Sequence, residues 1–209
     1  MDMSARVEII ASSLLRSNSL KFGLFKLKSG IISPYYIDLT WLLSSPEDFK
    51  AIVDIVADEI RNLSSRMRID CLASIELKGA LLLPSIAERV GKPCLIVRKE
   101  SKAYGLTGRI AGGYVKRGEH ILFFDDVITD GRSKIEGIKP LEDLGARVET
   151  VLVVIDREQG GRENMKKMGY NLISIVKISE IIEILRRLGK IPEEKAEEIL
   201  KYIKIHQQG

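Results

Sequence analysis

The chain has 209 residues, of which 45% are hydrophobic and 30% are charged, and this composition excludes a disordered or fibrous protein. The formal net charge of +4 is mild and favours small anionic ligands over an extended nucleic-acid surface. No apolar run reaches the roughly 20 residues that span a bilayer, the amino terminus lacks a signal-peptide pattern, and two cysteines make no disulfide framework. We therefore expect a cytoplasmic protein with no membrane or nucleic-acid partner.

The first part of the chain predicts a helix, a hairpin and a second helix. Apolar residues recur at helical spacing over Ser4–Arg16. Two short strands over 22–27 and 35–39 flank a Ser-Gly turn, which is typical of a hairpin. Ser45, a proline and two acidic residues then mark the start of a helix that runs to about Leu63.

The remaining chain alternates strands and helices. We expect strands over 70–75, 94–98, 121–124, 148–155 and 172–176, and helices over 81–90, 133–144, 179–188 and from Pro192 onward. This alternation predicts an α/β fold with a mostly parallel central sheet covered by helices on both faces. We interpret 1–209 as one domain, with an amino-terminal helix and hairpin (1–45), a core (46–176) and carboxy-terminal helices (177–209). Ligands of such sheets bind at the carboxyl ends of the strands.

One thirteen-residue segment, ILFFDDVITDGRS over 121–133, carries the most chemical information. It joins a buried strand to two acids, Asp125 and Asp126, and to a turn whose free N–H groups suit a phosphate at the start of a helix. The acids suit ribose hydroxyls or water on a magnesium ion. A solvated acidic turn explains an isolated acidic pair, but the whole segment resembles the phosphoribosyl pyrophosphate (PRPP) signature of type I phosphoribosyltransferases.

A second segment, FKLKSGIISPYYID over 25–38, resembles the signature of orotate phosphoribosyltransferases. Lys28 suits an anionic ligand, and Tyr35 and Tyr36 on a hairpin offer a flat wall for a pyrimidine ring. The alternative is a basic surface hairpin whose aromatic rings pack inward.

Three further segments occur in the order of the same family. The basic stretch 97–108 resembles the family's mobile catalytic loop, which there reaches into the neighbouring subunit's site, so the resemblance implies a homodimer that shares the 98–108 loop. Glu76–Gly79 resembles the pyrophosphate loop, with Lys78 as the matching lysine. Asp156–Glu158 resembles the segment whose arginine, here Arg157, holds the carboxylate of orotate. Taken alone, the basic stretch 97–108 also fits a solvated basic loop. The segment Asp156–Glu158 also fits a local ion pair between Asp156 and Arg157.

The resemblance implies a type I phosphoribosyltransferase fold with an amino-terminal hood and a mobile loop. It implies transfer of ribosyl 5-phosphate from PRPP to orotate in pyrimidine biosynthesis, with Mg²⁺ held mainly by PRPP and water near Asp125 and Asp126. The catalytic candidates are Lys99, Lys102, Asp125 and Asp126. The PRPP and pyrophosphate candidates are Lys78, Arg98, Lys99, Lys102, Asp125, Asp126, Val127, Ile128, Thr129, Asp130, Gly131, Arg132 and Ser133. The orotate candidates are Lys28, Tyr35, Tyr36, Thr129 and Arg157.

Some residues depart from the family pattern. Tyr104 stands where many members carry a histidine, and Asp130 and Arg132 stand in the phosphate turn where the family prefers small or hydroxyl residues. Two alternatives therefore stay open. One is transfer to another base, against which Thr129 counts, because purine-specific relatives place an acid there. The other is a PRPP-sensing regulator with weakened catalysis, for which salt-dependent binding of nucleic acid would be expected.

Overall fold

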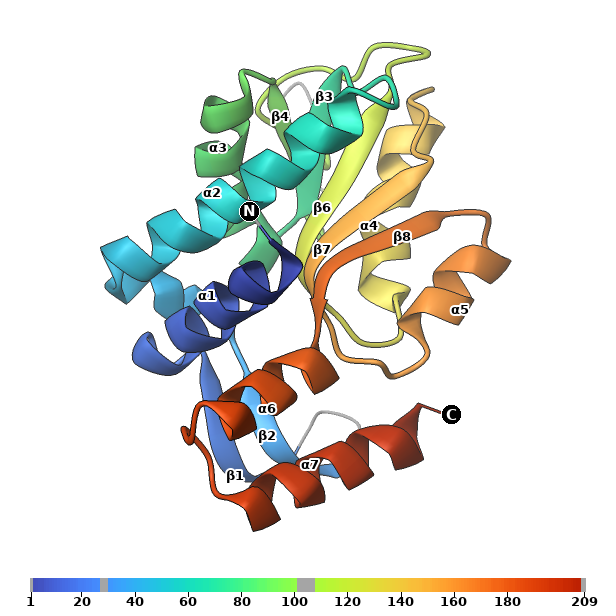
Figure 1. Cartoon of the computed structure of the whole chain (residues 1–209). Helices are drawn as coiled ribbons and strands as arrows, with labels where there is room; N and C mark the ends of the chain where they lie inside the picture. The colour runs from blue at the N-terminus through green and yellow to red at the C-terminus, as the bar shows by residue number, and fades with distance from the viewer. Residues whose placement is uncertain (1, 27–29, 101–107, 208–209) are drawn as a thin grey trace.

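The computed structural model describes residues 2–26, 30–100 and 108–207, and its centre is a six-stranded sheet (Figure 1). The strand order is β5-β4-β3-β6-β7-β8, with β5 antiparallel to β4 and the other neighbours parallel. The strands are β3 (Cys71–Ile75), β4 (Cys94–Val97), β5 (Ile110–Ala111), β6 (Ile121–Ile128), β7 (Thr150–Asp156) and β8 (Asn171–Lys177). The predicted α/β fold with a mostly parallel sheet is confirmed.

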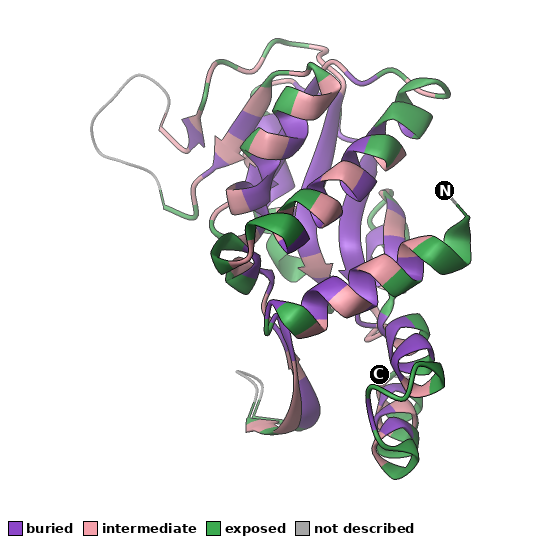
Figure 2. Ribbon diagram, turned by 60° about the vertical axis from the view of Figure 1, so that its left-hand side comes forward, coloured by how far each residue is buried: buried purple, intermediate pink, exposed green. Residues whose placement is uncertain are grey.

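Helices cover both faces of this sheet, because the strands are apolar on both sides. The helices are α1 (Met3–Arg16), α2 (Pro46–Ser64), α3 (Lys78–Val90), α4 (Arg132–Asp143), α5 (Gly161–Lys167), α6 (Ile178–Arg187) and α7 (Glu193–His206). Leu122 and Phe124 of β6 face the core under α1, α2 and α3, whereas Phe123 faces the core under α4 and α5. Figure 2 shows buried residues concentrated in the strands and on the helix faces that turn toward them.

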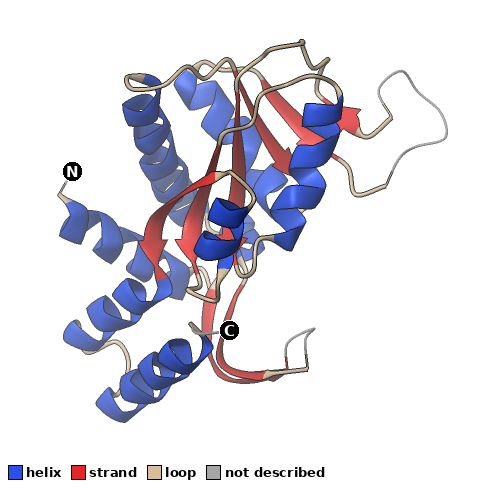
Figure 3. Ribbon diagram, turned by 90° about the vertical axis from the view of Figure 1, so that its right-hand side faces the viewer, coloured by secondary structure: helices blue, strands red, loops and turns tan. Residues whose placement is uncertain are grey.

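A smaller unit lies beyond the carboxyl ends of β6, β7 and β8 (Figures 1 and 3). It consists of an antiparallel hairpin, β1 (Leu20–Lys26) and β2 (Ile32–Ile37), together with α6 and α7, and we call it the hairpin lobe. The hairpin is separate from the central sheet. The lobe therefore faces the sheet edge at which ligands of parallel α/β folds bind.

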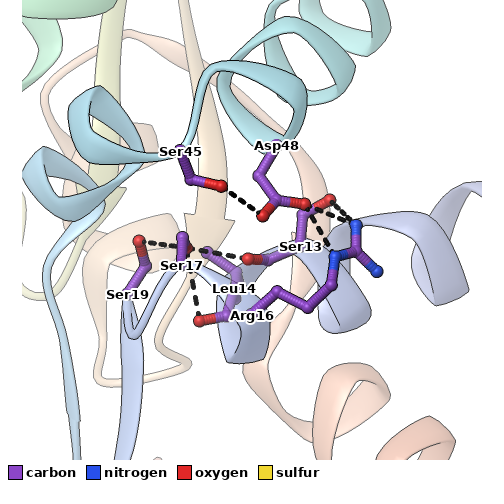
Figure 4. Close-up of polar contacts among 7 residues, drawn as sticks. All are labelled: Ser13, Leu14, Arg16, Ser17, Ser19, Ser45 and Asp48. Carbon is purple, nitrogen blue, oxygen red and sulfur yellow. Dashed lines mark hydrogen bonds and ion pairs between the residues drawn. The ribbon is translucent and has the colours of Figure 1, made fainter.

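A polar network joins α1 to the start of α2 (Figure 4). Asp48, in the first turn of α2, is 3% exposed and accepts hydrogen bonds from Arg16 Nε at 3.1 Å and from Ser45 Oγ at 2.6 Å. The negative charge also lies at the positive end of the α2 dipole. This network fixes the angle at which the chain enters α2.

Several elements differ from the sequence predictions. The strand expected over 121–124 continues to Ile128, so the two acids lie inside β6, and α3 begins at Lys78 rather than at residue 81. A 3₁₀ helix over Leu39–Ser44 and the short elements α5 and β5 were not predicted. Within the described ranges, no helix is long and apolar enough to cross a membrane.

Candidate active site

Asp125 and Asp126 form a buried acidic pair in β6, with 5% and 4% of their surfaces exposed. Asp125 forms an ion pair with Lys134, and its Oδ1 accepts a hydrogen bond of 2.9 Å from the Asp126 backbone N–H. Burial, followed by the neighbouring Asp125 charge, raises the pKa of Asp126 to about 8. Asp126 Oδ2 is buried with no hydrogen-bond partner among the described residues. Once Asp126 releases its proton, its Oδ2 can accept a hydrogen bond from a hydroxyl group or a metal-bound water.

The first turn of α3 packs directly on this acidic pair through Gly79. A Cβ atom at residue 79 would lie 2.6 Å from Ser74 Oγ and 2.8 Å from Asp125 Cα, distances that real side chains do not tolerate. A glycine is required here because no larger residue fits. The close approach holds the segment 76–79 against β6.

Lys78 connects this segment to the hairpin lobe. Its Nζ lies 3.2 Å from Asp38 Oδ1 and 5.9 Å from the centre of the Tyr36 ring. The lysine side chain is 43% exposed, so an anion reaches it from solvent. Lys78 thus lies between the acidic pair and the aromatic hairpin.

The turn after β6 places backbone groups at the start of α4. Gly131 has φ of +88°, a left-handed conformation that favours glycine, and it precedes the helix. Arg132 N–H donates to Asp130 Oδ1 at 3.1 Å, and Arg132 Nε donates to Asp130 Oδ2 at 2.6 Å. Asp130 therefore occupies one N–H group of the turn, while Arg132 balances its charge.

Arg157 follows β7 and packs against Tyr35 of the hairpin. Only 8% of Arg157 is exposed, and its Cζ lies 5.0 Å from the centre of the Tyr35 ring. Its Nε and Nη2 are buried with no partner among the residues that the structure describes. Asp156 Oδ2 instead lies 3.6 Å from Arg162 Nη2. The structure therefore does not show the alternative, a local ion pair between Asp156 and Arg157.

The two hairpin tyrosines differ in their surroundings. Tyr35 is completely buried, because its side chain turns inward toward Arg157, as in the alternative interpretation of inward-packed rings. Tyr36 is half-buried, and its ring lies 5.6 Å from that of Phe25. Of the two rings, Tyr36 is the one that remains accessible to a flat ligand.

The loop after β4 is described only at its two ends. Arg98 Nη1 lies 3.5 Å from the Gly108 carbonyl oxygen, and Lys99 N–H donates to Glu76 Oε1 at 2.6 Å. Lys99 is exposed beside the segment 76–79. Lys28, Lys102 and Tyr104 lie outside the described residues.

The structure brings most of the predicted site residues to one edge of the sheet. The residues at this edge are Lys78, Arg98, Lys99, Asp125, Asp126, Val127, Ile128, Thr129, Asp130, Gly131, Arg132, Ser133, Arg157, Tyr35 and Tyr36. Ile128 is the one residue of this set whose side chain is fully buried in the core under α4, so only its backbone can contact a ligand.

Sequence analysis missed two residues that bear on this edge. Lys134 is 4% exposed and shares a helix face with the buried residues Ile138 and Leu141. The sequence signal for it was a lysine on the apolar face of a helix that follows two acids closely in the chain. Tyr202 of α7 contacts Tyr35 edge-on at 6.0 Å between ring centres. It follows Ile199 by three residues on the buried face of α7, but the contact with the hairpin is tertiary and has no local signal.

The chain is similar to known phosphoribosyltransferases over most of its length. It is 36% identical over 176 residues to the orotate phosphoribosyltransferase of Pyrococcus abyssi, covering 84% of this chain and 95% of that relative. It is 35% identical over 203 residues to the Staphylothermus marinus enzyme of the same name, covering 97% of each chain. No protein-family model matches the chain.

Solved structures agree with these relatives. The UMP synthase of Leishmania donovani superposes with a TM-score of 0.85 and 28% identity over 96% of this chain and 42% of that chain. The orotate phosphoribosyltransferase of Aeropyrum pernix superposes with a TM-score of 0.73 and 29% identity, over 88% of this chain and 99% of that chain.

Proposed function

The chain belongs to the orotate phosphoribosyltransferase family, and we propose that it transfers the ribosyl 5-phosphate of PRPP to N1 of orotate, which yields orotidine 5'-monophosphate and pyrophosphate. This is a pentosyltransferase reaction of pyrimidine biosynthesis. The observation that carries the proposal is the convergence of three features at one sheet edge: a buried acidic pair, a helix-initiating turn and an arginine with unpaired donors.

The turn and the acidic pair suit the phosphate and ribose of PRPP. Backbone N–H groups from Thr129 to Ser133 lie at the start of α4, where the helix dipole favours an anion. When a phosphate binds, the Asp130 carboxylate must release the Arg132 backbone N–H or share this donor with the phosphate. Asp125 and Asp126 are placed to accept hydrogen bonds from ribose hydroxyls, since Asp126 Oδ2 lacks a partner among the described residues.

Cations line the side on which the pyrophosphate leaves. Lys78 and Lys99 lie around the segment 76–79, and Arg98 follows β4 beside them. Positive groups held there stabilise the charge that develops on the departing pyrophosphate. We assign the same role to Lys102, and we propose that the 98–108 loop is shared across a homodimer, as the family resemblance implies. We likewise propose a cytoplasmic location.

A magnesium ion fits this site through PRPP and water rather than through a cage of side chains. Among the described residues, no group of three His, Cys, Asp or Glu side chains stands close enough to hold a metal. Lys134 balances one acid, and Asp126 offers one free oxygen, which suits a metal-bound water. When bound, Mg²⁺ supplies positive charge to the pyrophosphate oxygens.

Arg157 and the hairpin suit orotate. The Nε and Nη2 groups form one edge of the guanidinium, whose parallel N–H bonds match the two oxygens of a carboxylate. Tyr36 offers the accessible ring, and we assign Lys28 and Thr129 to the same base subsite. The Tyr35 ring packs against Arg157 and helps to hold its guanidinium in this subsite.

Absorbance of orotate in the presence of PRPP and Mg²⁺ tests the proposal, with uracil, adenine and hypoxanthine in parallel. We expect consumption of orotate alone. The variant Arg157→Gln should raise the KM for orotate about 10- to 100-fold, because it removes hydrogen bonds to a charged group. The exposed control Arg66→Gln should behave as the wild type. Binding of PRPP without turnover of any base would instead favour the PRPP-sensing regulator.

A further inference from the structure

Three side chains from distant segments meet behind the proposed base subsite. Tyr35 comes from β2, Arg157 follows β7, and Tyr202 belongs to α7. The Tyr35 ring lies 5.0 Å from Arg157 Cζ and meets the Tyr202 ring edge-on, at 88° and 6.0 Å. Tyr202 also packs against His206, and their ring centres lie 4.1 Å apart. The carboxy-terminal helix thus reaches the environment of Arg157.

All three side chains bury polar atoms that lack partners among the described residues. These atoms are the hydroxyls of Tyr35 and Tyr202 and the Nε and Nη2 of Arg157. Tyr35 is fully buried and Arg157 is 8% exposed. Burying a polar group without a hydrogen-bond partner is unfavourable, so the cluster is destabilising unless a ligand satisfies it.

The chemistry of the cluster selects the ligand group. Two guanidinium N–H groups and two hydroxyls provide up to four donors, and the guanidinium adds a positive charge. A carboxylate has two oxygens with about four acceptor sites and a compensating negative charge. Phenylalanine rings would pack equally well without burying hydroxyls, so packing alone does not explain the two tyrosines.

We propose that Tyr202 of α7 determines specificity for orotate, with its hydroxyl joining Arg157 and Tyr35 as a donor to the carboxylate of the base. This inference rests on the proposed function, from which it takes the identity of the carboxylate. Because the donors are buried in the ligand-free protein, side chains of the cluster move aside when the carboxylate enters. The hairpin lobe therefore recognises the base with residues from both ends of the sequence.

The variant Tyr202→Phe tests the inference, because it keeps the ring and removes only the hydroxyl. We expect the KM for orotate to rise about tenfold while the KM for PRPP stays unchanged. The melting temperature of the ligand-free variant should stay the same or rise, since an unsatisfied hydroxyl has been removed. Tyr114→Phe is the matched control, because Tyr114 is 70% exposed outside the cluster.

Each outcome separates this inference from the proposed function. An unchanged KM for orotate in Tyr202→Phe overturns the donor role. Equal rises in both KM values, or a lower melting temperature, show a merely structural residue and also overturn it. If the wild-type protein does not consume orotate, the proposed function fails, whatever the variant does.

Discussion

Replacing Lys134 with methionine should unfold the protein at a much lower temperature. The Lys134 and Asp125 side chains are 5% and 7% exposed, and Lys134 Nζ also donates to the Val127 carbonyl oxygen at 2.7 Å. Methionine fills a similar volume but leaves Asp125 as a buried, uncompensated charge beside Asp126. Breaking one side of a buried pair costs about 3–5 kcal/mol. For a chain of this size, that loss lowers the melting temperature by about 6–20 °C.

Thermal and urea unfolding at several pH values measure this loss. We expect a larger loss at pH 8 than at pH 5, because Lys134 lowers the pKa of Asp126, which is about 8, so removing the lysine penalises the deprotonated pair that forms only toward pH 8. The control is Lys139→Met, which changes an exposed lysine of the same helix. In a double-mutant cycle, Asp125→Asn should recover part of the loss, because the double variant buries no unpaired charge at residue 125. Equal stability of Lys134→Met and the control at every pH would refute the reasoning.

Two further predictions concern stability. Asp48→Ala should lower the free energy of unfolding, measured in urea, by about 2 kcal/mol, because it removes the hydrogen bonds from Arg16 and Ser45 at the start of α2. The control Asp58→Ala, at an exposed residue, should lower it only slightly. The second concerns pH. Because the folded pKa of Asp126 is about 8 against an ordinary 3.8, the ligand-free protein holds a proton that the unfolded chain releases. Its unfolding free energy should therefore fall by up to about 4 kcal/mol from pH 5 to pH 8. The variant Asp126→Asn should show a much smaller decline. If the wild type and the variant decline equally, groups other than Asp126 cause the pH dependence.

Strong local patterns predicted most elements of the fold. The serine, proline and acidic residues at 45–48 predicted the start of α2 correctly, because a proline in the first helical turn and acids at the positive end of the helix dipole both act within one turn. The start of α3 at Lys78 was missed, since Gly79 is a poor helix former and is there for its close approach to Asp125. The two-residue strand β5 exists only because β4 offers a free edge, which no local pattern encodes.

The site was predictable where its residues are contiguous and not where they meet through folding. The segment from Asp125 to Ser133 is one strand and one turn, so its residue types revealed its geometry. The ion pair of Lys78 with Asp38 and the contact of Tyr35 with Tyr202 join residues 40 or more positions apart. Such pairs depend on tertiary packing, and a single sequence contains no record of them.

The hairpin lobe also has a consequence for how the protein is made. Its hairpin precedes the central sheet in the chain and is synthesised before it, whereas α7, which packs on the hairpin through Tyr202, is synthesised after the sheet. The segments that supply the phosphate turn and the acidic pair emerge in between, so the nascent chain can assemble its phosphate side before its base side exists. A chain that stops short of α7 would keep the sheet edge intact and leave the inner face of Tyr35 uncovered.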